Sequence, residues 1–309
     1  MNTNEIMNIL PKEIILKLEE IKDFNCIQEI RLRTNRPLII QINQKEIIKP
    51  YLVTKNDIKT ILQRISNYSL YAFEEEIRQG YITIKGGHRV GIAGDCVQEK
   101  EGIKTIRTIS SLNIRICKEV RGCGLNILPY VIEKGKILNT IIISPPKCGK
   151  TTILRDITRS ISDGDINKGL QGKKVVIIDE RSEIAACFEG VPQLNVGIRT
   201  DVYDNCMKSY GIIMAIRSMG PEVIISDEIG SLKDMESILL AMNSGVNIIT
   251  TIHGSGIEDM KKRSVFKDIL EEEVFRRAVV LSNRNGVGTI DYIYDFKDKK
   301  VIYGEKNYG

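Results

Sequence analysis

The first part of the chain alternates apolar and polar residues with the period of two that is typical of half-buried β-strands. Such stretches lie at Glu29–Arg33, Pro37–Ile42, Tyr81–Lys85 and His88–Ile92. Pro37–Ile42 is expected to pair with Glu29–Arg33 as a hairpin. Gly86 and Gly87 separate the last two stretches and favour a second hairpin with a tight turn there. Helical periodicity is found over Asp57–Ser66 and Leu70–Arg78. We therefore predict a small α+β domain.

The pattern changes near residue 135, where short apolar runs begin to alternate with segments of helical period. These runs lie at Ile137–Ile143, Val175–Ile178, Val223–Ile225 and Val246–Thr250. Apolar strands separated by helices are typical of βαβ units and of a mostly parallel sheet with helices on both faces. We predict an α+β domain over residues 1–135 and an α/β domain over residues 136–309. The final runs, Ala278–Leu281, Thr289–Tyr294 and Lys300–Tyr303, are expected to close the sheet as antiparallel strands.

A loop with the composition of a phosphate-binding loop follows the first apolar run of the second domain. It consists of Ser144, Pro145, Pro146, Lys147, Cys148, Gly149, Lys150, Thr151 and Thr152. It leads into the predicted helix Thr151–Ser162, whose N-terminus and loop N–H groups favour phosphate oxygens. In this pattern Lys150 reaches the β- and γ-phosphates of ATP, and the Thr151 hydroxyl binds Mg²⁺. Ser144 stands where the usual pattern has its first glycine.

Two of the apolar runs end in an Asp-Glu pair, and such residues point into the ligand crevice at the carboxyl edge of a parallel sheet. One carboxylate there can hold Mg²⁺, while the next orients or deprotonates a water for attack on the γ-phosphorus. In phosphate-loop ATPases of the additional-strand type, one strand lies between the loop strand and the metal strand in sequence. That order predicts Asp227 as the metal ligand and Glu228 as the catalytic acid. Asp179, Glu180 and Glu183 then form an auxiliary acidic group, in which Glu180 is the catalytic candidate.

A histidine and several arginines lie close to these segments in sequence. His253 comes just after the predicted sensor strand Asn247–Thr251, where an imidazole can respond to the state of the γ-phosphate. Arg181, Arg199 and Arg217 can each pair with the acids or reach the phosphates of a neighbouring subunit. In the first domain, Arg31, Arg33 and Arg89 lie in or beside predicted strands. The sequence leaves open which arginine acts across a subunit boundary.

Composition and charge exclude several classes of protein. The 309 residues are 42% hydrophobic and 28% charged, which is enough for two folded domains and excludes a disordered chain. The net charge of +5 is too small for a protein that holds nucleic acid by charge alone. The seven cysteines form no CxxC pair and predict neither a disulfide framework nor a zinc site. Polar residues interrupt the uncharged stretch Ser237–Ile257, so we predict no transmembrane segment.

In combination, these motifs resemble the secretion-ATPase superfamily, which includes type II and type IV secretion motors and pilus-retraction motors. The resemblance rests on the phosphate loop followed in order by Asp179–Glu183, Arg217–Gly230, Ser244–Val246 and Thr250–Gly254. Further segments resemble a sporulation family of endospore-forming bacteria within that superfamily. These segments are Glu29–Arg33, Gly87–Gly94, Glu180–Ala186 and Gly197–Val202.

The resemblance implies a P-loop ATPase of RecA-like fold that binds ATP and Mg²⁺. It also implies a homo-oligomer, a hexameric ring, in the cytoplasm and peripheral on the cytoplasmic face of the mother-cell membrane. Its partners would be the membrane-embedded channel proteins that link mother cell and forespore, with the ring powering or gating assembly or transport. Two alternatives stay open: a nucleotide-gated scaffold with little hydrolysis, and a nucleic-acid-dependent ATPase. Glu228 favours hydrolysis, and the absence of Trp counts against base stacking.

Overall fold

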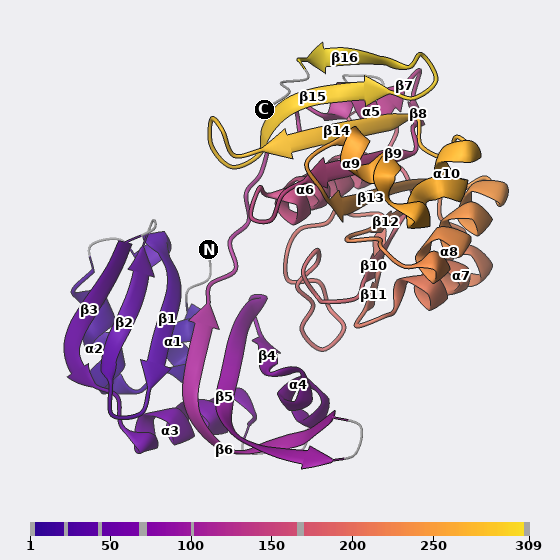
Figure 1. Ribbon diagram of the computed structural model, residues 1–309. Helices are drawn as coiled ribbons and strands as arrows, with labels where there is room; N and C mark the ends of the chain where they lie inside the picture. Colours follow the sequence, from indigo (N-terminus) through magenta and orange to yellow (C-terminus); the bar gives the residue numbers. More distant parts are fainter. Residues whose placement is uncertain are drawn as a thin grey trace. The chain divides into compact units, whose positions relative to one another are not determined.

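The computed structural model describes residues 4–21, 24–42, 45–67, 73–99, 102–165 and 170–305. The chain forms two compact units, which Figure 1 draws in indigo to magenta and in magenta to yellow. The first unit comprises Met1–Lys118 with the short segment Ala186–Gln193, and the second comprises Glu119–Ala185 with Leu194–Gly309. We keep residues 1–135 and 136–309 as the proposed domains.

The first unit is built on a six-stranded sheet in the order β3-β2-β1-β6-β5-β4, with antiparallel pairs throughout. Its strands are β1 (Ile27–Arg33), β2 (Pro37–Ile42), β3 (Lys45–Leu52), β4 (Tyr81–Ile84), β5 (His88–Glu99) and β6 (Gly102–Arg115). Its helices are α1 (Asn4–Ile9), α2 (Lys12–Glu19), α3 (Lys55–Ile65) and α4 (Glu74–Gln79), with a 3-10 turn at Phe24–Cys26. Side chains of the helices and of one sheet face form a single apolar core.

Both hairpins predicted for this unit are confirmed, because Ile30 pairs with Ile40 and Ile82 pairs with Val90. The predicted helix near residue 57 is also confirmed: α3 begins with a capping box between Thr54 and Asp57. Of the helix predicted over 70–78, α4 covers the later part, and residues 70–72 lie outside the described residues. The edge strand β3, the whole of β6 and the part of β5 after Ile92 were not predicted, since charged and polar residues obscure their alternation.

The second unit contains an eight-stranded sheet. Its strands are β9 (Thr140–Ser144), β10 (Val175–Asp179), β11 (Thr200–Asp204), β12 (Val223–Ser226), β13 (Asn247–His253), β14 (Arg277–Ser282), β15 (Thr289–Asp295) and β16 (Lys300–Gly304). Its helices are α5 (Leu128–Val131), α6 (Lys150–Asp163), α7 (Lys208–Ser218), α8 (Leu232–Asn243), α9 (Ile257–Lys262) and α10 (Lys267–Glu271). A small hairpin of β7 (Ile132–Glu133) and β8 (Lys136–Ile137) precedes β9, and a 3-10 turn lies at Ser264–Phe266.

The sheet order is β11-β10-β12-β13-β9-β14-β15-β16, and the strands from β11 to β14 run parallel. The predicted α/β fold with a mostly parallel sheet is therefore confirmed. Strand β13 lies between the loop strand β9 and β12, as in additional-strand ATPases. The prediction that β14 is antiparallel was wrong: it pairs in parallel with β9, and only β15 and β16 add antiparallel edges. A strand's direction depends on its connection, and here α9 and α10 return the chain to the starting edge of the sheet.

Helices cover both faces of this sheet. Ile141 and Ile143 of β9 share an apolar core with residues of α7, α8, α9 and α10, whereas α6 packs on β9, β10 and β13 without contributing to that core. Because alternate strand residues point to opposite faces, Ile142 lies on the face covered by α6. Figure 1 shows α7 and α8 side by side at one end of the unit.

Among the described residues, no helix combines the length and the apolar character needed to cross a bilayer. The uncharged stretch over residues 237–257 is divided between α8 and β13.

Candidate functional site

The phosphate loop connects the carboxyl end of β9 to the N-terminus of α6. Lys147 and Gly149 have positive φ angles of 62° and 82°, which turn the loop around the helix N-terminus. A Cβ atom on Gly149 would lie 3.0 Å from Val287 Cγ1, in the hairpin between β14 and β15. Both the backbone conformation and the close neighbour therefore favour glycine at this position.

The loop residues divide by exposure. Pro145, Pro146 and Lys147 are exposed, Gly149, Thr151 and Thr152 are half-buried, and Ser144, Cys148 and Lys150 are buried. The Ser144 carbonyl accepts a hydrogen bond from Gly254 N at 3.1 Å, so the loop begins against the end of β13. Ser144 thus occupies the first loop position as a strand residue.

Three of the predicted site residues form a continuous chain of contacts. Lys150 Nζ lies 2.8 Å from His253 Nδ1, and His253 Nε2 lies 2.7 Å from Glu228 Oε1. Because an ammonium can only donate, Nδ1 accepts and Nε2 carries the proton donated to the carboxylate. Burial lowers the pKa of Lys150 from its usual value, while the nearby Glu228 carboxylate opposes that shift. The structure therefore brings together residues that are far apart in sequence.

The backbone of Glu228 is held in an uncommon conformation. Its φ of 44° lies in the left-handed region, which costs free energy for a residue with a side chain. Its N–H donates to Thr251 Oγ1 at 2.9 Å, and the N–H of Ile229 donates to the Thr251 carbonyl at 3.0 Å. Arg181 Nη1 lies 3.1 Å from Glu228 Oε2, on the side of the carboxylate away from His253. Glu228 is thus positioned by β13 and by two basic side chains.

Asp227 precedes Glu228 and is 2% exposed. Burial, with the nearby carboxylates of Asp179 and Glu183, raises the pKa of Asp227 to about 7, and Lys208 opposes the rise. This concentration of buried acidic groups beside the phosphate loop is an environment that a divalent cation would neutralise. Among the described residues there is no group of three or more His, Cys, Asp or Glu side chains arranged to hold a metal ion. Asp227 and the Thr151 hydroxyl supply oxygen ligands of the kind that fits Mg²⁺, which is commonly held by one or two protein ligands together with substrate phosphates.

Asp179 has a structural role that the sequence did not reveal. Its two carboxylate oxygens accept hydrogen bonds from the N–H groups of Glu183, Ile184 and Ala185 at 2.8, 2.9 and 2.8 Å. Burial raises the pKa of Asp179, and these donors oppose the rise. Arg155 of α6 donates to the carbonyls of Glu183 and Ile184 in the same loop. The loop after β10 is thus fixed through both its N–H and its carbonyl groups.

Glu180, the other acid of the first pair, forms an ion pair with the buried Lys208 at the start of α7. Sequence reasoning missed Lys208, Arg155 and Thr251, because nothing in their local pattern distinguishes them from ordinary helix and strand residues.

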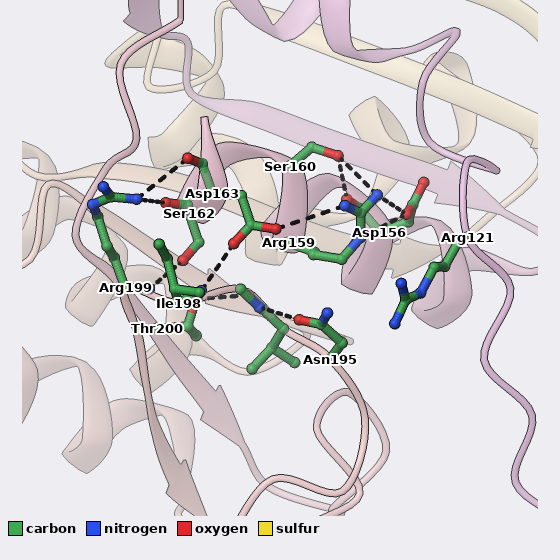
Figure 2. A network of polar contacts seen from close by, with 12 residues as sticks. Arg121, Asp156, Arg159, Ser160, Ser162, Asp163, Asn195, Ile198, Arg199 and Thr200 are labelled. Carbon is green, nitrogen blue, oxygen red and sulfur yellow. Dashed lines mark hydrogen bonds and ion pairs between the residues drawn. The ribbon is translucent and has the colours of Figure 1, made fainter. Parts of the chain in front are cut away.

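Of the three candidate arginines in the second unit, Arg181 and Arg199 make polar contacts within that unit. Figure 2 shows the surroundings of Arg199. Arg199 Nη1 donates to the carbonyl of Ser162 at 2.9 Å and to that of Asp163 at 3.3 Å, at the C-terminal end of α6. Asp163 in turn accepts from Ile198 N at 2.9 Å, so this segment is tied to α6. A cation at a helix C-terminus also interacts favourably with its dipole. Arg181 pairs with Glu228 as described, and Arg217 is exposed on α7.

Gly197, at the start of the segment Gly197–Val202, is required by close packing against α6. Its φ is 98°, and a Cβ there would lie 2.4 Å from Ser162 Cβ, so only glycine permits the close approach. The motif Gly197–Val202 therefore supports the structure around α6 and β11.

Comparison with known proteins decides the family. Residues 1–301 match the family model described as "Sporulation stage III, protein AA". The chain belongs to this family. Stage III sporulation protein AA of Bacillus subtilis (strain 168) is 45% identical over 301 residues, which is 97% of each chain. The predicted resemblance is thereby confirmed.

Solved structures of secretion ATPases share the fold of this family member. The ATPase DotB of Yersinia pseudotuberculosis has a TM-score of 0.62 at 14% identity, covering 92% of this chain and 78% of DotB. The pilus retraction motor PilT has a TM-score of 0.61 at 14% identity, covering 96% of this chain and 83% of PilT. At this identity the likeness establishes the fold, and it confirms the predicted secretion-ATPase architecture.

Proposed function

We propose that this sporulation protein binds Mg-ATP at the phosphate loop and hydrolyses it. The observation that carries the proposal is the contact chain from Lys150 through His253 to Glu228. It joins a phosphate-binding lysine to a carboxylate that can act on water, at the carboxyl edge of a sheet with the strand order of additional-strand ATPases. The secretion-ATPase fold of the structural relatives supports the same function.

In this proposal the loop N–H groups and Lys150 bind the phosphates, and Lys150 exchanges its contact with His253 for a phosphate oxygen. Thr151 and Asp227 would hold Mg²⁺, which neutralises charge on the transferred phosphoryl group. Glu228 orients the attacking water and accepts its proton. His253 keeps Glu228 oriented and changes partner when Lys150 moves, while Glu180 and Lys208 position the neighbouring acidic loop.

A ring of identical subunits is the proposed assembly, docked to the membrane-embedded channel between mother cell and forespore. Its support is the family membership together with the secretion-ATPase fold. Hydrolysis in such a ring would power or gate assembly or transport through the channel. Two alternative functions remain to be distinguished from this one by experiment: a nucleotide-gated scaffold with little hydrolysis, and a nucleic-acid-dependent ATPase.

Replacing Lys150 with Ala is expected to weaken ATP binding by about a hundredfold, because a charge-assisted contact to phosphate is lost in a partly buried site. Isothermal titration with Mg-ATP measures this directly. Lys174→Ala is the matched control, because Lys174 is exposed at the opposite end of β10 from Asp179. Equal affinity of Lys150→Ala and Lys174→Ala would contradict the assigned nucleotide site.

Replacing His253 with Ala is expected to lower turnover by about tenfold or more while ATP affinity is kept or increased. The reason is that the substitution removes one of the two basic partners of Glu228 and also frees Lys150 from its contact in the nucleotide-free protein. Phosphate release and ATP titration, made on the same preparation, separate the two effects. Unchanged turnover would show that His253 does not orient Glu228.

A further inference from the structure

A groove of about 590 Å³ lies in the second unit, away from the phosphate loop. Strand β14 runs parallel to β9, so its first residue, Arg277, lies at the sheet edge opposite to the phosphate loop. Arg277 pairs with Asp295, the last residue of β15. Phe275, two residues before Arg277, and Phe296, directly after Asp295, line the groove. The groove is therefore a separate feature from the proposed nucleotide site.

The rim of the groove contains more basic than acidic side chains. Five cationic side chains line it, Lys261, Lys262, Arg263, Lys267 and Lys299, against the two acids Glu271 and Glu273. All seven residues are exposed. Within the described residues, neither Lys262 nor Lys299 has a carboxylate within ion-pair distance. Lys261, Arg263 and Lys267 are paired with Glu258, Asp259 and Glu271, so among the described rim residues Lys262 and Lys299 are the two ammonium groups available to an incoming anion.

The floor of the groove is apolar. It includes the buried Ile269 and Phe275 and the half-buried Leu270, Tyr294 and Phe296. The rings of Tyr294 and Phe296 meet edge to face, with centroids 5.3 Å apart and an interplanar angle of 84°. A groove of this kind fits a ligand with one apolar group that contacts the floor and with negative charges around it that contact the basic residues of the rim.

A hydrogen-bonded connection joins the groove to the end of β13. Asp259 Oδ2 of α9 accepts a hydrogen bond from Ser255 N at 3.2 Å and another from Arg263 Nη2 at 2.8 Å. Ser255 follows His253 by two residues, whereas Arg263 lines the groove. Asp259 therefore connects a groove residue to the segment that follows His253.

We propose that this groove docks an acidic peptide segment of a partner protein, with an aromatic or large aliphatic side chain inserted between Phe275 and Phe296. The carboxylates of the segment would pair with Lys262 and Lys299 at the rim. This docking site goes beyond the proposed nucleotide hydrolysis and does not depend on it.

The same features disfavour single-stranded nucleic acid as the occupant. Bases bind in succession to aromatic faces that are open for stacking, whereas the edge-to-face pair in the groove offers no continuous platform. Glu271 and Glu273 at the rim also repel a backbone with a phosphate at every nucleotide, while a peptide can space its acids around them.

Selection of random dodecapeptides displayed on phage against the immobilised full-length protein tests the proposal. The selected peptides are expected to be rich in Asp and Glu and to contain an aromatic or Leu residue. Their affinity is then measured by fluorescence anisotropy with synthetic labelled copies. Replacing the single aromatic or Leu residue of the peptide with Ala is expected to weaken binding at least tenfold, because the apolar insertion is lost.

The double variant K262E/K299E is expected to weaken binding of these peptides by about tenfold or more, because each reversal turns an attraction into a repulsion. K233E/K297E is the matched control: it makes the same change in net charge at exposed lysines outside the groove. Circular dichroism verifies that both variants fold. Selected peptides without acidic enrichment, or equal binding by the two double variants, would overturn the proposal. The peptides are also challenged with a twelve-nucleotide oligothymidylate, added at a concentration that supplies as many negative charges as the peptide does. Displacement of the peptides by this oligonucleotide would reassign the groove to nucleic acid.

Discussion

Replacing Glu228 with Gln is expected to lower the rate of ATP hydrolysis by about a thousandfold while ATP binding is retained. A positioned general base contributes about 10²–10⁴ to a rate, and the amide of Gln cannot accept the proton of water. The substitution keeps the side-chain shape, and its carbonyl oxygen can still accept the His253 Nε2–H bond. The expected signature is therefore a loss of turnover without a loss of affinity, which phosphate release and ATP titration measure together.

The control for this variant is Glu236→Gln, which makes the same chemical change on the exposed face of α8. It is expected to hydrolyse ATP at the wild-type rate. If Glu228→Gln also retained the wild-type rate, Glu228 would not be the base, and the role of the contact chain to Lys150 would be structural only.

Replacing Asp179 with Ala is expected to lower the free energy of unfolding by about 3 kcal/mol or more. Three backbone N–H groups lose their acceptor, and each unsatisfied buried donor costs about 1–3 kcal/mol. Arg155, which holds the carbonyls of the same loop, would remain bound to a loop that is no longer fixed on its other side. Urea unfolding followed by circular dichroism measures the change in midpoint.

Asp201→Ala serves as the control for stability, since Asp201 is exposed on β11 and substitutions of that kind change stability by about 0.5 kcal/mol or less. The free energy of unfolding of Asp179→Asn is expected to lie between those of Asp179→Ala and Asp201→Ala. In this variant one acceptor oxygen remains, while an NH₂ group faces the other donors. Equal stability of Asp179→Ala and Asp201→Ala would show that Asp179 does not hold the loop.

The phosphate loop and the positions of most buried strands along the chain could be predicted from the sequence, because both leave local patterns. Isoleucine-rich runs identify buried parallel strands, and the loop between Ser144 and Thr152 has a composition tied to one kind of binding. The proximity of Lys150, His253 and Glu228 also follows once three parallel strands are known to end at one edge.

What could not be predicted depends on side chains that meet across the fold. Asp179 resembles a catalytic acid in sequence, and only the structure reveals that its oxygens bind three backbone N–H groups. The direction of β14 depends on the path of α9 and α10, which no local pattern records. Similarly, the groove is lined by residues of α9, α10 and the hairpin of β15 and β16. These residues are up to 38 positions apart in the sequence, from Lys261 to Lys299.

Phosphate release with Mg-ATP, measured on the purified protein over a series of protein concentrations, tests the central claim most directly. Wild type is compared with Lys150→Ala and Glu228→Gln, with and without single-stranded DNA. The account predicts turnover per subunit that rises with protein concentration, is lost in both variants and is unaffected by DNA. A wild-type protein that binds ATP but releases phosphate no faster than Glu228→Gln would contradict hydrolysis at this site and favour the scaffold. Turnover that requires DNA would instead favour the nucleic-acid-dependent ATPase.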